Sequence, residues 1–480
     1  MAPALKIPIA DITRSALSLV DIGTVFHWED RVFRAIDAEH RDEVIALFDS
    51  GLVSALVERK LLVKSWISDT SLGDDTLLIE HEAISVPTYP REWTFSMLKD
   101  AALLILELNE VARTFGYQTK DCNGYNVLFR EGRPLFVDLG SFTPVSRDEQ
   151  CLLSYNEFLK AYLYPLRLWS DGGEQIGRWS VPRAFGRFLS PSSYLRFRWS
   201  WLRHVGENKL NSAWKLICSL RTIRHNNLSY LSNKYPKLII SALQWIKRFG
   251  LTARPAYIKV LRRRVARLRC AHASSTWGDY HSIMYGDGIP LMTPRFEAIV
   301  EHVCGMNPTS VLEIAGNQGI LCRWLRERLP QARLICSDAD AIALDRGYVQ
   351  SRDLQECVEW AVYDPIAPEA SPLERTALDR YRSQIVIALA LTHHLVLAQG
   401  VRIDDVLVCL ARHATDIVIT EFMPLGLHDG KTGENPPAWY TRDWFECAFN
   451  RHFELIHSSQ LEQNRIVFIG RVRGSDSGVQ

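Results

Sequence analysis

Residues 311–319, Val-Leu-Glu-Ile-Ala-Gly-Asn-Gln-Gly, decide the fold of the C-terminal part of this chain. An apolar run typical of a buried strand leads there into a glycine-bearing turn. Apolar side chains recur at helical spacing over 320–329, and a second apolar run, 334–336, is followed by Asp338. Strand, glycine turn, helix, strand and carboxylate are, in this order, the layout of a nucleotide-type cofactor site in a doubly wound parallel sheet.

The glycine pattern of this turn differs from the dinucleotide-binding form. Ala315 and Asn317 stand where two of the glycines would be, whereas Gly316 and Gly319 remain. A strand-end acid, Glu313, before such a loosened turn resembles the first motif of class I S-adenosylmethionine-dependent methyltransferases. That resemblance implies a cofactor site made by these five residues and by the acid after the next strand, which would accept hydrogen bonds from ribose hydroxyls.

Alternating strands and helices continue to the end of this block, as a parallel α/β sheet demands. Further strands are expected at 358–362, 384–391 and 416–420, and a closing hairpin at 453–458 and 465–472. Asp364 follows the third strand. In the methyltransferase layout it would bond the adenine amino group, but an acid at a strand end also often caps a helix.

His393 and His394 follow the fourth strand, at the edge of the sheet where ligands bind. Methyl transfer is an in-line displacement that needs alignment of donor and acceptor and sometimes removal of a proton. Histidine titrates near neutrality, so either residue is a candidate base or substrate-orienting group. The alternative is that one histidine caps the strand end and the other merely packs.

A second constellation lies near the N-terminus. Asp121 and Asn126, followed by Asp138 before a glycine, resemble the catalytic and metal-binding loops of the kinase-like fold. Arg34 stands on the strand that would carry the lysine, and an arginine holds a phosphate without replacing that lysine. These four residues form a possible vestigial nucleotide or metal site, and the favoured interpretation is a degenerate domain used for binding or assembly.

Several phrases together resemble one group of bacterial two-part methyltransferases, with a kinase-like N-terminal region and a class I methyltransferase domain. They are residues 93–101, 120–126, 136–142, 389–395 and 421–424. Within that group the chain is most similar to rhizobial host-specificity nodulation proteins. The resemblance implies S-adenosylmethionine as cofactor and, as acceptor, a saccharide or small metabolite such as a lipochitooligosaccharide nodulation signal or its precursor.

Composition is that of a globular protein. Of the 480 residues, 47% are hydrophobic and 23% charged, and the ten cysteines show no metal-binding spacing. The N-terminus lacks the apolar core of a signal peptide, and no stretch reaches the roughly 18–20 apolar residues of a spanning helix. These features predict a cytoplasmic protein with reduced thiols, without a metal site or a transmembrane segment.

The expected organisation has five parts. These are a degenerate kinase-like α+β domain (1–148), a basic and mainly helical region (149–270), a linker (271–289), a doubly wound, Rossmann-like methyltransferase domain (290–473) and a disordered tail (474–480).

Charge is strongly segregated along the chain. Residues 178–269 hold 21 Lys or Arg residues and one acid, Glu207, whereas the whole chain has a net charge of +1. Basic residues among aromatics are candidates for binding an anionic ligand, a glycolipid or membrane surface, or less plausibly nucleic acid. The alternatives to a saccharide methyltransferase are therefore an RNA methyltransferase and a non-catalytic scaffold with inherited folds.

Overall fold

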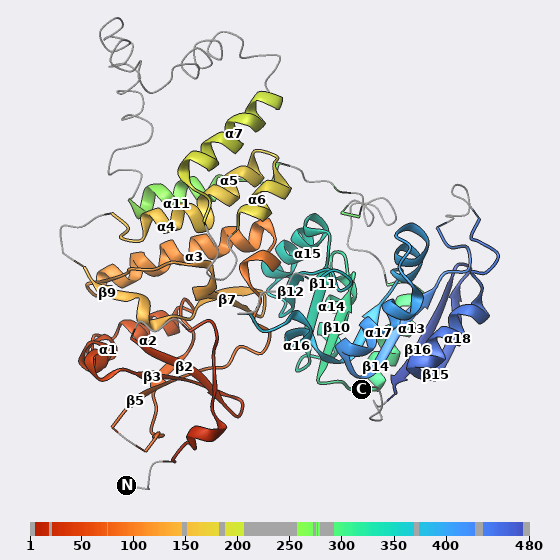
Figure 1. The fold of residues 1–480 in the computed structure, drawn as a ribbon, viewed down its shortest axis with the longest axis horizontal. Coiled ribbons are helices and arrows are strands. Elements are labelled where there is room, and N and C mark those ends of the chain that lie inside the picture. Colours follow the sequence, from red (N-terminus) through yellow and green to blue (C-terminus); the bar gives the residue numbers. More distant parts are fainter. Residues whose placement is uncertain are drawn as a thin grey trace, which may run out of the picture.

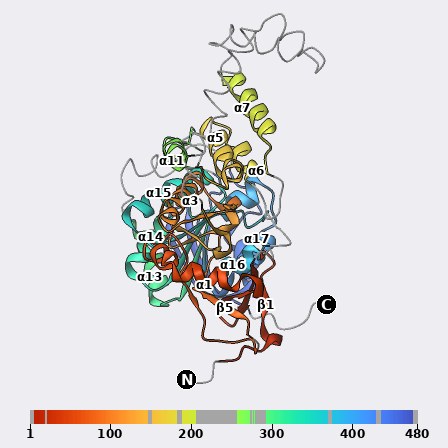
Figure 2. The same ribbon diagram turned by 90° about the vertical axis from the view of Figure 1, so that its left-hand side faces the viewer.

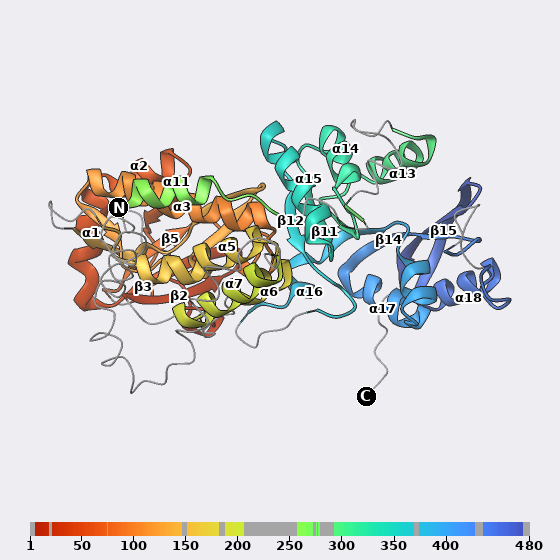
Figure 3. The same cartoon turned by 90° about the horizontal axis from the view of Figure 1, so that it is seen from above.

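The structure is a computed structural model. It describes residues 5–18, 22–73, 75–145, 151–181, 188–205, 257–271, 275, 277–278, 292–368, 374–427 and 435–473. Two bodies lie side by side, an N-terminal one and a C-terminal one, which meet along α3, α15 and β12 (Figure 1, and from above in Figure 3). The predicted tail, 474–480, and most of the basic run lie outside the described residues.

The N-terminal body begins with a five-stranded sheet in the order β1-β2-β3-β5-β4, and every strand pair in it is antiparallel. Its strands are β1 (Thr13–Arg14), β2 (Gly23–Trp28), β3 (Arg31–Ile36), β4 (Ser65–Ile67) and β5 (Leu77–His81). Short helices accompany it: η1 (Ile9–Asp11), η2 (Ala38–His40), α1 (Arg41–Asp49) and α2 (Leu52–Glu58). Strands β2 and β3 form an antiparallel hairpin.

Helix α3 (Phe95–Thr114) is the central helix of this body. Thr94 caps its start by accepting a hydrogen bond from the backbone N–H of Met97, and the helix buries one face along its whole length. Around it lie η3 (Pro90–Glu92), β6 (Tyr117–Thr119), η4 (Gly124–Asn126), β7 (Val127–Arg130), β8 (Arg133–Phe136), η5 (Leu139–Ser141) and β9 (Phe142–Pro144). Strand β6 pairs with β9 and β7 with β8, and both pairs are antiparallel.

The described part of the basic region is helical, as its sequence predicts. It comprises α4 (Tyr155–Phe158), the π-helix η6 (Leu159–Leu163), α5 (Tyr164–Ser170), α6 (Glu174–Ser180), α7 (Pro191–Val205) and α11 (Ile258–Ala266). Helix α11 packs on α3, and α7 projects from the body, as Figures 1 and 2 both show. No described helix is both long and apolar enough to cross a bilayer.

The C-terminal body is a seven-stranded sheet in the order β12-β11-β10-β13-β14-β16-β15. Strands β10 to β14 are parallel, and β16 runs antiparallel between β14 and β15. The strands are β10 (Ser310–Ile314), β11 (Arg333–Asp338), β12 (Glu359–Val362), β13 (Ser383–Ala388), β14 (Ala414–Phe422), β15 (Phe453–Glu462) and β16 (Arg465–Val472). Each predicted strand of this block is present, and the strand order reverses between β10 and β13, where such sheets bind ligands.

Helices cover both faces of this sheet. They are α13 (Pro294–Gly305), α14 (Ile320–Arg328), α15 (Ala341–Leu354), α16 (Ala377–Tyr381), the π-helix η9 (His394–Ala398), α17 (Ile403–His413) and α18 (Arg442–His452). The central strands β10 and β13 are buried on both sides, so their continuous apolar runs carry no alternation.

Helices α3 and α15 join the two bodies. Asp345 accepts hydrogen bonds from the backbone N–H (2.7 Å) and the hydroxyl (2.9 Å) of Ser96, in the first turn of α3. One turn further along each helix, Asp100 accepts from the Tyr348 hydroxyl at 2.8 Å and forms an ion pair with Arg352 at 2.7 Å. The helix that follows the β11 carboxylate is therefore held by the N-terminal body.

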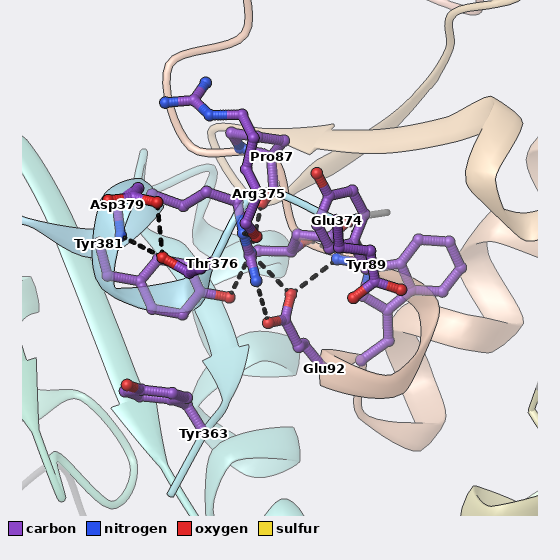
Figure 4. A network of polar contacts seen from close by, with 12 residues as sticks. Pro87, Tyr89, Glu92, Tyr363, Glu374, Arg375, Thr376, Asp379 and Tyr381 are labelled. Atoms are coloured by element: carbon purple, nitrogen blue, oxygen red, sulfur yellow. Dashed lines mark hydrogen bonds and ion pairs between the residues drawn. The ribbon is translucent and has the colours of Figure 1, made fainter. Parts of the chain in front are cut away.

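A buried network around Arg380 forms the second part of this interface (Figure 4). The Arg380 guanidinium donates to both carboxylate oxygens of Glu92, at 2.5 and 2.8 Å, and to the carbonyl oxygen of Pro87. It also lies over the rings of Tyr89 and Tyr381, with centroid distances of 4.5 and 4.7 Å. Glu92, Pro87 and Tyr89 belong to the N-terminal body, whereas Tyr381 and the carbonyl oxygen of Arg375, which accepts from Arg380 at 2.9 Å, belong to the C-terminal body.

Replacing Glu92 with alanine is expected to lower the free energy of unfolding by about 3–5 kcal/mol, because Arg380 (3% exposed) would be left as a buried charge without its carboxylate. Urea unfolding followed by circular dichroism measures this loss. Asp405→Ala, which removes the partner of the exposed Arg402, is the control and should leave the midpoint unchanged. Equal midpoints for the two variants would contradict a structural role for the network.

Candidate functional site

The turn after β10 is held in an unusual backbone conformation. Ala315, Asn317 and Gly319 all adopt positive φ, at 56°, 54° and 64°. Glycine and asparagine tolerate this left-handed region, but alanine does not favour it. A Cβ on Gly316 would lie 2.7 Å from the Cys336 Sγ, so the chain has room only for glycine there. The sequence thus keeps the backbone path of a glycine-rich loop while using other residues at two of its positions.

Asp338, at the end of β11, ties this loop to the neighbouring strand. One carboxylate oxygen accepts from the backbone N–H of Asn317 and the other from that of Asp340, both at 2.8 Å. Each oxygen keeps a further lone pair for a ligand donor. Burial raises the pKa of Asp338 to about 6. The acid and the turn that the sequence assigns to one site are therefore in direct contact.

Glu313 lies deeper, beneath the turn. Its carboxylate accepts from the backbone N–H of Cys322, in the first turn of α14, at 3.3 Å. Burial raises its pKa to about 7. Glu313 therefore supports the turn and the start of α14 from inside, and only 6% of it is exposed.

Asp364 occupies a different kind of position. It is exposed, two residues beyond β12, and its Oδ1 accepts from the backbone N–H groups of Ile366 (2.9 Å) and Ala367 (3.3 Å). These bonds close a turn in the loop after β12, and no helix begins in the described part of that loop, so Asp364 caps no helix. Its second oxygen, Oδ2, takes no part in these two bonds.

The two histidines lie at the carboxyl end of β13, next to the turn after β10. Their ring centroids are 4.0 Å apart, and the π-helix η9 begins at His394. His393 is 4% exposed, and its Nδ1 has no hydrogen-bond partner within the part of the chain that the structure describes. Burial, with help from His394 and Arg465, lowers the pKa of His393 to about 3, and burial lowers the pKa of the half-buried His394. Both rings are therefore neutral at pH 7 and able to accept a proton.

Glu421, at the end of β14, holds the histidine loop in place. It is fully buried and forms a two-pronged ion pair with Arg295, at 2.6 and 2.9 Å, and a second with Arg465 at 3.0 Å. The same carboxylate accepts from the backbone N–H of Ala390, and the Glu421 carbonyl accepts from the Thr392 hydroxyl at 2.7 Å. The two arginines hold the pKa of Glu421 below its ordinary value. In the sequence this glutamate stands out only as part of the phrase 421–424, which does not reveal its role.

The segment expected to be a linker contributes to the site. The Trp277 carbonyl accepts from the Asn317 side-chain amide at 2.8 Å, and the indole packs edge-on against the His394 ring at a centroid distance of 4.6 Å. The Gly278 carbonyl accepts from Gln318 (3.1 Å) and from Arg346. Trp277 therefore touches both halves of the candidate site. A Trp-Gly pair in a polar stretch was the only sequence signal for it.

The second constellation is only partly assembled. Arg34 pairs with Asp138 at 2.7 Å, and the Ser141 hydroxyl donates to Asp138 at 2.6 Å while it accepts from the Asn126 amide at 3.3 Å. Asp121 instead accepts from the backbone N–H of Asn123 at 2.7 Å. Asp138 and Asn126 thus meet at Ser141, and Arg34 joins them through its ion pair with Asp138, which pairs both charges.

Asp121 faces a second carboxyl group, that of Glu157. Burial and the hydrogen bond with Asp121 raise the pKa of Glu157 to about 7, and Glu157 also accepts from the backbone N–H of Cys122 at 2.8 Å. No group of three metal-binding side chains is present within the described ranges. All cysteines among these residues are free.

The C-terminal body is thus an α/β domain with a mainly parallel sheet, and it has the reversal in strand order, the closing hairpin and the strand-end acids that its sequence predicts. The chain is similar to the nodulation protein NoeA of Rhizobium meliloti (strain 1021), which is 26% identical over 424 residues, or 84% of this chain and 83% of NoeA. No family model matches the chain.

Solved structures, two of which are named as methyltransferases, match the chain in part. A putative O-methyltransferase from Nostoc punctiforme PCC 73102 is 17% identical and covers 41% of this chain and 59% of its own, with a TM-score of 0.29. The N-methyltransferase NodS from Bradyrhizobium japonicum WM9 is 11% identical and covers 38% and 99%, with a TM-score of 0.28. The PH0226 protein from Pyrococcus horikoshii OT3 is 12% identical and covers 41% and 99%, with a TM-score of 0.32.

Replacing Ala315 with glycine is expected to raise the free energy of unfolding by about 1 kcal/mol, because glycine adopts the positive φ at this position without strain. Thermal unfolding of the ligand-free protein measures this gain. The matched control is Ala411→Gly within α17, which should lower stability by about 0.5–1 kcal/mol. A loss in both variants would show that the turn stores no strain at Ala315.

The raised pKa of Glu313 predicts a pH-dependent stability. A carboxyl that binds its proton more tightly in the folded protein makes the free energy of unfolding fall as pH rises from its ordinary pKa of 4.5 to its folded value of about 7. At about 1.4 kcal/mol per pKa unit, the free energy of unfolding falls by at most about 3.5 kcal/mol.

Urea unfolding at pH 5 and pH 7.5 tests this prediction. Glu313→Gln should reduce the difference between the free energies of unfolding at these two pH values. Glu301→Gln, at an exposed position of α13, is the control and should keep the wild-type difference. An unchanged pH dependence in Glu313→Gln would mean that Glu313 is ionised at both pH values.

Proposed function

We propose that this protein is an S-adenosylmethionine-dependent methyltransferase whose catalytic domain spans residues 290–473. One observation carries the proposal: the left-handed turn after β10 is hydrogen-bonded to Asp338 at the end of β11, beside the point where the strand order reverses. Ligands of doubly wound sheets bind at this edge. The similarity to NoeA and the methyltransferase resemblance of the turn support the same conclusion.

The residues present suit this cofactor. Asp338 has lone pairs left for the ribose hydroxyls. The Oδ1 of Asn317, which has no hydrogen-bond partner among the residues that the structure describes, is a second buried acceptor beside it. Gly316 and Gly319 keep side chains out of the turn, and Asp364 offers an oxygen to an amino group. S-adenosylmethionine, when bound, supplies an activated methyl group on a positively charged sulfur.

The histidines serve the acceptor side of the reaction. We assign proton removal to His394, which is half-buried, and an orienting role to His393, whose lower pKa makes it the weaker base. Glu421 positions both residues through its bonds to Ala390 and Thr392, in the loop that carries them. Trp277 closes the side of the site nearest the turn after β10.

The acceptor is proposed to be a saccharide or another small metabolite. NoeA is named as a nodulation protein, and a lipochitooligosaccharide nodulation signal or its precursor is the acceptor in keeping with that name. A hydroxyl of such a molecule carries a proton that must leave when a methyl group is added, which suits a neutral imidazole.

The N-terminal part, 1–148, is proposed to be a degenerate kinase-like domain that binds or presents a ligand without phosphoryl transfer. Its antiparallel sheet, the following helix α3 and the loops with Asn126 and Asp138 support this interpretation. The Arg34–Asp138 ion pair and the contact between Asp121 and Glu157 occupy the groups that a nucleotide or metal would need. The helical region, 149–270, and the segment 271–289 complete the proposed division.

Binding of S-adenosylmethionine by the purified full-length protein, measured by calorimetric titration, tests the proposal. We expect a micromolar Kd that Asp338→Ala weakens at least tenfold, because the ribose acceptor and the anchor of the turn are lost together. Asp353→Ala, at an exposed position near the end of α15, is the matched control and should bind like the wild type.

Absence of binding by folded wild-type protein would contradict the enzyme proposal and favour a scaffold with inherited folds. If binding is established, affinity for RNA that falls steeply with salt would favour RNA methylation directed by the basic region. The part of that region between 206 and 256 lies outside the described residues.

A further inference from the structure

Trp277 is placed between the two halves of the candidate site. Its carbonyl oxygen is hydrogen-bonded to Asn317 in the turn after β10, and its indole contacts His394 after β13. These two strands are neighbours in the sheet. A ligand that extends from the turn after β10 toward the histidines would therefore lie next to the Trp277 side chain.

The segment that carries Trp277 is fixed at several points. The Ser275 hydroxyl donates to Asp340 at 2.6 Å and accepts from the backbone N–H of Gly278 at 2.8 Å. The Gly278 carbonyl is held by Gln318 and Arg346, and a Cβ on Gly278 would lie 2.6 Å from the Ser275 Oγ. The backbone position of Trp277 is thus set by the turn and by α15, the elements that adjoin Asp338.

Trp277 keeps 41% of its surface exposed, although its backbone is anchored on both sides. Tryptophan is the side chain with the strongest attraction for a cation over its ring face. A positively charged group at the junction of turn and histidines would gain from this ring, whereas a neutral group of the same shape would gain only contact area.

We propose that Trp277 binds the positively charged sulfonium of S-adenosylmethionine by a cation–π interaction and so favours the methyl donor over the demethylated product. The proposal rests on the proposed function. It adds a binding residue from outside the sheet and a means by which the site releases S-adenosylhomocysteine, whose sulfur is neutral.

The test compares three ligands by calorimetric titration of the full-length protein. Trp277→Leu should weaken binding of S-adenosylmethionine about tenfold and leave binding of S-adenosylhomocysteine within about twofold. Sinefungin, which carries a protonated amine in place of the sulfonium, should lose affinity as S-adenosylmethionine does. Trp277→Phe retains an aromatic face and should recover most of the loss.

Trp66→Leu, at a 37% exposed position of β4, is the control and should leave all three affinities unchanged. An equal loss for the charged and the neutral ligand in Trp277→Leu would overturn the proposal and show that the indole acts by contact area alone. Unchanged affinities would overturn it as well. If the wild-type protein binds none of the three ligands, the failure belongs to the proposed function instead.

Discussion

The carboxylate of Asp338 fixes the loop on which the candidate site depends. Its two oxygens accept backbone N–H groups on either side, from Asn317 after β10 and from Asp340 before α15. A buried carboxylate is costly unless its lone pairs are satisfied, so these bonds hold two strand ends in one geometry. Because the loop must come close to Asp338 to make them, it adopts positive φ at three alternate positions, even where the residue is alanine.

The strands and their order along the chain can be predicted from the sequence because the signals are local. Apolar runs bounded by turn residues predict the buried strands, and the acid after the second run marks the ligand edge. The same reasoning identifies Glu313 and Asp338 but does not separate their roles. Their difference depends on depth: Glu313 lies beneath the turn against α14, whereas Asp338 borders it.

The residues that the sequence did not reveal act through contacts between distant segments. Trp277 lies in a polar stretch without periodicity, and only the folded chain brings it to Asn317 and His394. The partners of Glu421, Arg295 and Arg465, stand on other elements and leave no spacing pattern. For the same reason the pairing of Arg34 with Asp138, which closes the second constellation, could not be derived from the spacing of its loops.

Through the interface around Arg380, the N-terminal body helps to fix the geometry of the candidate site. A buried ion pair contributes little net stability once the desolvation of both charges is counted, but it tolerates few alternative arrangements. Arg380 requires Glu92 and Pro87 at one position, and Asp345 requires the start of α3 at another. Helix α15 therefore cannot shift without breaking buried polar contacts. Since α15 begins directly after the Asp338 turn, the N-terminal body constrains the cofactor edge without contributing a side chain to it.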